Sequence, residues 1–198
     1  RRSSDLQMVV IHDERVDRTT DGGGLVCEHT LEQLKKLRID APDGRARRIP
    51  TMEEVLDLLA PRLAGGLQLN IELKNSLIPY DGMEEKIVAL VHARGVQKRL
   101  VYSSYYARSL DPAAEIGVLD VRVSDCLYKL KGGCGATALH PGGWGIDLPA
   151  EQLRGYPVRA WFTGHLYPEK PTGGRMDLAK LEAQGVTDVF LNAAERYV

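Results

Sequence analysis

The first apolar run of the chain leads directly into two polar residues. Met8–Ile11 is short and rich in β-branched side chains, and it is followed by His12 and Asp13. This pattern predicts a buried strand with the polar pair at its C-terminal end. In α/β folds that end of a strand is where catalytic groups are usually placed. A strand that happens to end in two polar residues would give the same pattern.

A second run shows a strict alternation of polar and apolar positions. In Leu67–Lys74 the polar residues Asn70, Glu72 and Lys74 alternate with leucine and isoleucine. A period of two puts the three polar groups on one face of a strand. Charges on a buried face must be paired or bind something. The pattern therefore indicates an edge strand with one wet face, or a barrel interior in which Glu72 binds a metal and Lys74 contacts an anion.

The rest of the chain alternates between strand and helix patterns. Thr51 followed by Glu54 is a capping box that predicts the start of a helix. Further helices are expected at 31–37, 52–61, 83–94, 105–111, 125–131, 149–155 and 175–184, and strands at 67–74, 99–104, 116–123, 136–140, 157–163 and 187–192. Residues 40–50 read as a loop whose arginines contact solvent or a phosphate. Six strand–helix units predict an α/β fold with a parallel sheet.

Composition narrows the class of protein. A length of 198 residues suits one domain spanning 1–198, and 26 basic against 27 acidic residues give no reason to expect a nucleic acid partner. No apolar run approaches the ~20 residues of a membrane span, so stable membrane insertion is not expected. Three cysteines without a Cys-x-x-Cys motif favour reduced thiols and a cytoplasmic location.

Several motifs occur in an order that resembles a known family. They are His12-Asp13, Asp17-Arg18-Thr19-Thr20-Asp21-Gly22, Ile49–Leu56, Ile71-Glu72-Leu73-Lys74, Ser103-Ser104, Leu139-His140-Pro141 and Ala160-Trp161. Together they resemble the glycerophosphodiester phosphodiesterase family, which acts in lipid and glycerol metabolism. The resemblance covers essentially the whole chain, and it is most specific in the first 75 residues.

The resemblance implies a fold. Family members form a (β/α)8 TIM barrel, in which residues 6–50 would be an insertion or hairpin region beside the barrel mouth. Their first two strands carry His-Arg-Gly and Glu-x-Asp, and these would precede residue 1 at about 30 residues per unit. An incomplete barrel would leave strand edges open, so a homo-oligomer is possible.

The resemblance also implies the chemistry. Glu72 would be one oxygen ligand of a divalent cation, Ca²⁺ or Mg²⁺, with the Glu-x-Asp carboxylates as the other ligands. His12 would be a general acid or base, and Lys74 would offset charge on the phosphate. The expected reaction is hydrolysis of a small-molecule glycerophosphodiester to glycerol 3-phosphate and an alcohol.

Three further residues are candidates for substrate binding. Arg18 belongs to the motif that follows His12. His140 ends a strand, and a histidine bonded to the backbone is an equal alternative. The family-like role of Trp161 is to pack against glycerol, with core packing as the alternative.

Two departures from the family pattern fall at strand ends, at Phe162-Thr163-Gly164 and Leu191-Asn192-Ala193-Ala194. Residues 165–174 form a long loop that could act as a lid. The alternatives are a phospholipase C-like lipid phosphodiesterase, which an exposed apolar rim would favour, and a non-catalytic phosphodiester-binding relative. The segments Gly132–Gly135 and Gly142–Gly145 match no phosphate-loop pattern, so a nucleotide-binding fold is discounted.

Overall fold

The computed structural model describes residues 7–40, 44–106, 114–162 and 176–191. The chain divides into two compact units, which are described separately. Unit 1 comprises residues 1–69 and 74–99, and unit 2 comprises residues 70–73 and 100–198. That the whole chain acts as one domain stays a prediction. The expected loop at 165–174 and most of the expected helix at 105–111 lie outside the described residues.

The N-terminal segment of unit 1 is extended but is not a buried strand, so this prediction was wrong. Val9 forms an isolated antiparallel bridge with Thr51, and the amide of Val10 donates to the carbonyl of Pro50 at 2.9 Å. Val9 and Ile11 pack from one side on a small core of Val16, Leu34 and Ile49. Because the segment pairs with the entrance to a helix rather than with a sheet, its other side remains partly exposed.

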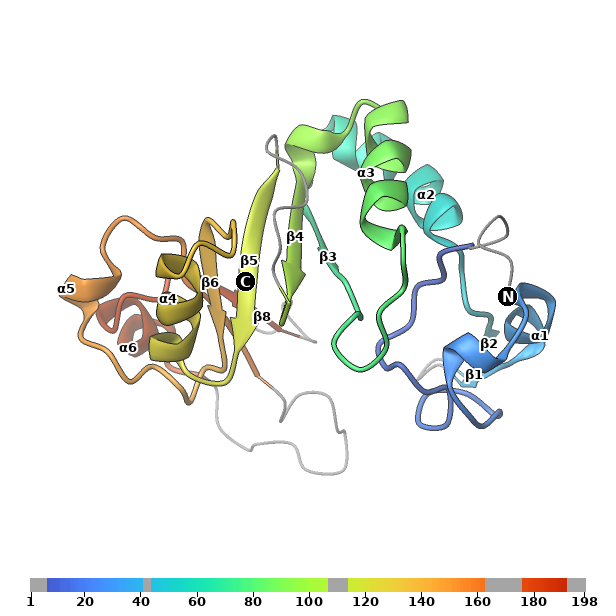
Figure 1. Cartoon of the computed structure of the whole chain (residues 1–198), viewed down its shortest axis with the longest axis horizontal. Coiled ribbons are helices and arrows are strands. Elements are labelled where there is room, and N and C mark those ends of the chain that lie inside the picture. Colours follow the sequence, from blue (N-terminus) through green and yellow to red (C-terminus); the bar gives the residue numbers. More distant parts are fainter. Residues whose placement is uncertain (1–6, 41–43, 107–113, 163–175, 192–198) are drawn as a thin grey trace. The chain divides into compact units, whose positions relative to one another are not determined.

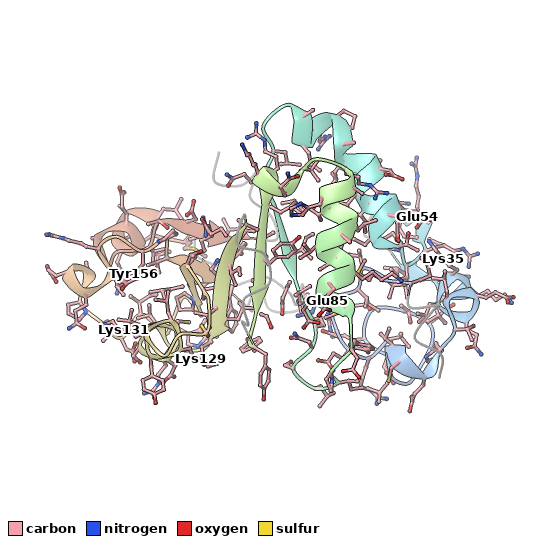
Figure 2. All side chains as sticks on the ribbon, turned by 45° about the horizontal axis from the view of Figure 1, so that its top comes forward. Lys35, Glu54, Glu85, Lys129, Lys131 and Tyr156 are labelled. Atoms are coloured by element: carbon pink, nitrogen blue, oxygen red, sulfur yellow. The ribbon has the colours of Figure 1, made fainter. Side chains whose placement is uncertain are left out.

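Both helices with capping boxes begin where the sequence predicts. Helix α1 (Leu31–Lys36) has Thr30 as its N-cap, and α2 (Met52–Ala64) has Thr51, whose hydroxyl accepts a hydrogen bond from the Glu54 amide at 3.3 Å. Lys35 of α1 and Glu54 of α2 form an ion pair, and both are labelled in Figure 2. Helix α2 continues through Pro61 to Ala64, one turn beyond the predicted end.

The predicted loop at 40–50 contains a short antiparallel pair, β1 (Ile39–Asp40) and β2 (Ala46–Arg47). Arg48 follows β2 and donates to the carbonyls of Lys35 and Lys36 at 3.0 and 2.7 Å. These are carbonyls of the last turn of α1, which have no partner within the helix. Arg48 therefore caps a helix, and the hypothesis that it clamps a phosphate loses support.

The remaining elements of unit 1 are the predicted helix α3 (Met83–Ala93) and two short 3₁₀ helices, η2 (Val26–Glu28) and η3 (Gln97–Arg99). The sequence did not predict the two 3₁₀ helices. The pattern of α3 predicts that Ile87, Val88 and Val91 face inward. Ile87 and Val91 are buried, and Val88 is partly buried. Gly95 follows the helix with φ of +66°, a left-handed conformation that glycine adopts without strain.

The six strands that the sequence predicts are present, and all but the first residue of β3 belong to unit 2. They are β3 (Leu69–Glu72), β4 (Leu100–Ser104), β5 (Glu115–Asp120), β6 (Ala138–Pro141), β7 (Arg159–Trp161) and β8 (Asp188–Phe190). Strands β3 to β6 form one sheet in chain order, and β7 pairs with β8. The pairs β4–β5, β5–β6 and β7–β8 are parallel, and two parallel bridges join β6 to the β7 segment. The order of β3, β4, β5 and β6 can be followed in Figure 1.

Three helices cover one face of these strands, namely α4 (Val123–Lys131), α5 (Ala150–Leu153) and α6 (Leu178–Ala183). The core between them includes Val118 and Leu139 from the strands with Cys126, Leu153 and Leu181 from the helices. The α/β class with a parallel sheet is therefore confirmed. Among the described residues the strands form an open series in chain order, and a closed ring is not seen.

Replacing the N-cap of α2 is expected to weaken unit 1. Thr51→Ala removes the hydroxyl that accepts from the Glu54 amide, and the loss of such a cap costs about 1 kcal/mol of unfolding free energy. Urea denaturation of the whole chain measures the change. Thr51→Ser keeps the hydroxyl and should lose less. Equal losses in the two variants would show that the cap is not the cause.

Candidate functional site

The strand register places a set of side chains on the sheet face opposite the helices. Ser103 pairs with Gly117, and Gly117 pairs with Ala138, so the three positions lie at one level of that face. Two residues further along β6, His140 lies on the same face. The bridge between Gly142 and Trp161 puts Trp161 there as well. We call this the inner face of unit 2.

His140 lies fully buried across Gly117. A Cβ atom at Gly117 would stand 2.2 Å from the imidazole ring, so the ring occupies the space where a side chain would be. The ring meets Phe190 of β8 edge-on, with 5.3 Å between centroids. Neither ring nitrogen has a hydrogen-bond partner among the described residues, so the alternative of a histidine bonded to the backbone is not seen.

Burial decides the charge of His140. Loss of solvent, with a smaller contribution from the nearby Arg159 guanidinium, lowers the pKa of His140 to about 3. Arg159 itself pairs with Glu115 of β5 and with Asp188 of β8, the latter at 3.5 Å. His140 is therefore a neutral imidazole at physiological pH and supplies no positive charge to a phosphate.

Trp161 is fixed by a hydrogen bond and by ring contacts. Its indole Nε1 donates to the carbonyl of His140 at 3.0 Å. The rings of Trp144 and Trp161 meet at 84°, with 5.0 Å between centroids. Trp161 is half-buried, whereas Ala160 beside it lies wholly in the helix-side core. The indole therefore belongs to the inner face and keeps part of its surface open.

Glu72 lies where the alternation of β3 predicts. Ile71 and Leu73 are buried, while Glu72 is only partly so. On the same strand the Asn70 amide donates to the hydroxyl of Ser103 at 3.1 Å, which places this side of β3 on the inner face. Burial first, and then the negative charge of Glu72, raise the pKa of Tyr105 after β4. Glu72 thus lies close to the C-terminal end of β4.

Lys74 continues the alternation beyond β3. It is partly buried, and it belongs to unit 1 together with His12 and Arg18.

In unit 1, the side chains of His12 and Arg18 both contact the carboxylate of Asp13. Nδ1 of His12 lies 2.6 Å from Oδ1 of Asp13, and Nε of Arg18 donates to Oδ2 of Asp13 at 2.6 Å. The hydrogen bond from Arg18 comes first among the causes that lower the pKa of Asp13, and His12 adds to it. Asp13 is therefore an anion that can fix the orientation of the imidazole. This leaves Nε2 of His12 for proton exchange.

The sequence hypothesis did not give Asp13 a role. The signal was present, because Asp13 directly follows His12, and an aspartate beside a histidine commonly sets its tautomer. Nor did it predict that Arg18 binds Asp13.

Within the described ranges no group of three histidine, cysteine or acidic side chains is arranged to hold a metal ion. The described residues therefore do not form a complete metal centre by themselves, and Glu72 offers one carboxylate. The same residues contain no helix with the length and apolar character that crossing a membrane requires.

A family model matches more than half of the chain. Residues 1–115 match the model described as the glycerophosphoryl diester phosphodiesterase family. A glycerophosphodiester phosphodiesterase of Caldanaerobacter subterraneus subsp. tengcongensis is 37% identical over 126 residues, which are 59% of this chain and 51% of that protein. The chain spans about half the length of the curated relatives it matches.

Solved structures show the same fold. A putative glycerophosphodiester phosphodiesterase from Galdieria sulphuraria superimposes with a TM-score of 0.72 at 23% identity, covering 94% of this chain and 76% of that one. A phosphodiesterase from Oleispira antarctica, solved with its product sn-glycerol-3-phosphate, superimposes with a TM-score of 0.65 at 26% identity, covering 95% and 76%. These neighbours support the predicted TIM-barrel class.

The packing of His140 on Gly117 gives a stability prediction. Gly117→Ala puts a methyl group into the imidazole ring, and such overpacking costs about 1–3 kcal/mol of unfolding free energy. Denaturant titration measures the loss, and the double variant Gly117→Ala with His140→Ala should recover part of it. Gly65→Ala is the control, because its new Cβ would lie 3.5 Å from its nearest neighbours. Lack of any recovery in the double variant would contradict the proposed clash.

The neutral state of His140 gives a pH prediction. Its folded pKa is about 3 and its unfolded pKa is about 6.5, so protonation favours the unfolded chain. Stability should fall as the pH drops from about 6.5 towards 3, by up to about 1.4 kcal/mol per pH unit from this group. His140→Gln removes the titration, so its unfolding free energy should depend less on pH in this window. Parallel pH profiles for the two proteins would contradict the prediction.

Proposed function

This chain belongs to the glycerophosphoryl diester phosphodiesterase family, and we propose that it hydrolyses glycerophosphodiesters to glycerol 3-phosphate and an alcohol. The observation that carries the proposal is the contact of His12 and Arg18 with Asp13, within the region that the family model matches. The product complex of the Oleispira antarctica neighbour supports the same class of substrate.

In this proposal His12 transfers a proton. Hydrolysis of a phosphodiester requires a base for the attacking water or an acid for the departing alcohol. An imidazole whose Nδ1 faces an anionic carboxylate can exchange a proton through Nε2. Asp13 is thus a positioning residue for His12. Arg18 donates to the second carboxylate oxygen of Asp13. Arg18, which the sequence predicts to bind substrate, therefore acts in this proposal indirectly, by holding Asp13.

Glu72 and Lys74 are assigned to compensating the negative charge of the substrate's phosphate group, Glu72 through a bound cation. Lys74 offsets negative charge by its ammonium group. Glu72 is assigned one ligand position of a Ca²⁺ or Mg²⁺ ion, which takes six or more oxygen ligands, so the described residues supply only part of the set. Such a cation, when bound, neutralises phosphoryl oxygens.

Trp161 is proposed to contact the glycerol moiety. Its indole keeps part of its surface open on the inner face, while its N–H is already bonded to the His140 carbonyl. An indole with its polar atom occupied presents mainly an apolar surface, which suits the carbon side of glycerol. We assign His140 to the positioning of Trp161, because its own ring is fully buried.

A cytoplasmic location and a homo-oligomeric state remain predictions. Cys27, Cys126 and Cys134 form no disulfide with one another in the described structure.

Substitution of His12 or Glu72 tests the proposed function. Release of glycerol 3-phosphate from glycerophosphoethanolamine, with Mg²⁺ or Ca²⁺ present, is the measurement. His12→Ala should lower kcat by about 10²–10⁴-fold, since that is the usual contribution of a positioned acid or base. Glu72→Gln should raise the cation concentration needed for half-maximal rate.

His92→Ala is the matched control, because His92 is an exposed histidine of α3 and should leave the rate unchanged. Unchanged turnover in both His12→Ala and Glu72→Gln would remove the proposed mechanism.

A further inference from the structure

One side chain joins the segment that carries His12 to the loop that follows Lys74. Oε1 of Glu14 accepts a hydrogen bond from the amide of Leu77 at 3.0 Å and another from the hydroxyl of Ser76 at 3.4 Å. Glu14 lies two residues after His12, and Ser76 lies two residues after Lys74. All five residues belong to unit 1. We call this pair of hydrogen bonds the Glu14 contact.

The backbone of Glu14 is itself held in place. Its carbonyl accepts from the amide of Val26 at 3.0 Å, and Arg15 forms an antiparallel bridge with Leu25. The carboxylate therefore projects from a paired segment. Its second oxygen, Oε2, is buried and has no hydrogen-bond partner among the described residues. Glu14 thus holds the loop through Oε1 alone, and a glutamine at this position would keep that acceptor.

The loop at 75–82 is anchored at both ends. The side-chain amide of Asn75 donates to Oε1 of Glu84, in the first turn of α3, at 2.9 Å. At the other end the amide of Met83 donates to the carbonyl of Tyr80 at 3.0 Å. Because α3 fixes the two ends, the loop presents Ser76 and Leu77 to Glu14 from a defined position.

Tyr80 gives the loop a second contact with the same part of unit 1. Its hydroxyl is hydrogen-bonded to the thiol of Cys27, which belongs to η2. Burial comes first, and then Cys27 and Glu14, among the causes that raise the pKa of Tyr80 to about 12. The hydroxyl therefore keeps its proton at physiological pH. Three segments of unit 1 thus come together around Glu14.

This arrangement limits the position of Lys74. Two residues of extended chain span at most about 7 Å, so the backbones of His12 and Lys74 each lie within that distance of one side of the Glu14 contact. The ammonium group stands on a flexible stem, so its location depends on where the backbone is fixed. A misplacement of about 1 Å can lower a rate by about 10²-fold.

We propose that Glu14 is a positioning residue for Lys74, which it holds in register with His12 through the loop at 75–82. This rests on the proposed function, in which His12 transfers a proton and Lys74 offsets the charge of the phosphate. Two adjacent acidic residues then have separate roles. Asp13 orients the imidazole, and Glu14 places the ammonium group without contacting the substrate.

Binding of sn-glycerol 3-phosphate to the whole chain tests the proposal, because binding requires the phosphate contact but no reaction. Calorimetric titration at one fixed Mg²⁺ concentration is the measurement. Lys74→Ala should weaken binding about tenfold or more, as expected for the loss of a hydrogen bond to a charged group. Glu14→Ala should weaken it at least about threefold, since Lys74 remains but is misplaced. Glu14→Gln keeps the acceptor and should stay within about twofold of the wild-type protein.

The double variant of Glu14→Ala with Lys74→Ala separates positioning from a purely structural role. If Glu14 acts through Lys74, its removal should change binding by less than about twofold once the lysine is absent. In the hydrolysis assay, Glu14→Ala should lower kcat/KM and leave the shape of the pH profile of kcat unchanged, because Asp13 still orients His12.

Glu85→Ala is the matched control. Glu85, labelled in Figure 2, is an exposed glutamate of α3 in the same unit, so its loss should leave binding unchanged. Circular dichroism verifies that each variant is folded. If Glu14→Ala is not folded, Glu14→Asp replaces it, because aspartate keeps the charge but is one methylene too short for the contact.

Several outcomes would overturn the proposal. They are unchanged binding in Glu14→Ala, an equal loss in Glu14→Gln, the same loss with and without Lys74, and no binding by the wild-type protein. If the effects of Glu14 and Lys74 are independent and the wild-type protein hydrolyses glycerophosphoethanolamine, the positioning role is rejected and the proposed function stands. If the effects depend on each other and no hydrolysis is seen, the positioning role stands and the proposed hydrolysis is rejected.

Discussion

The interior of unit 2 depends on the missing side chain at Gly117. The imidazole of His140 lies in the space that a Cβ would fill, and this allows the ring to reach Phe190 of β8. With His140 fixed, its carbonyl faces the indole N–H of Trp161, and Trp161 in turn supports Trp144. One glycine in β5 thus permits a series of contacts that ends at an exposed aromatic ring. The tight packing of protein interiors explains why so small a change has consequences at that distance.

The sequence predicted the elements whose signals are local. The hydroxyl of Thr51 and the carboxylate of Glu54 are three residues apart, so the capping box could be read directly, and the structure contains it. The alternation in β3 placed Ile71 and Leu73 in the interior in the same way. Local rules failed at Met8–Ile11, because an apolar β-branched run does not reveal whether a partner strand exists on each side.

The candidate site was predictable in part for the same reason. His12, Asp13 and Arg18 lie within seven residues, and their contacts are short-range. The burial of His140 depends on the register of β5 and β6, which no single segment encodes. The glycines around Trp144 could not be interpreted from sequence, since their purpose is close contact with Val121 and Phe162 on other segments.

The ion pairs of Arg159 restrict how this interior can vary. One guanidinium joins Glu115 of β5 to Asp188 of β8, although β6 and β7 separate these strands in the order of the unit. Removing the arginine alone would leave two carboxylates without their shared cation, and removing one carboxylate would leave the partly buried guanidinium near His140 with one partner instead of two. Substitutions at Glu115, Arg159 and Asp188 should therefore occur together among relatives.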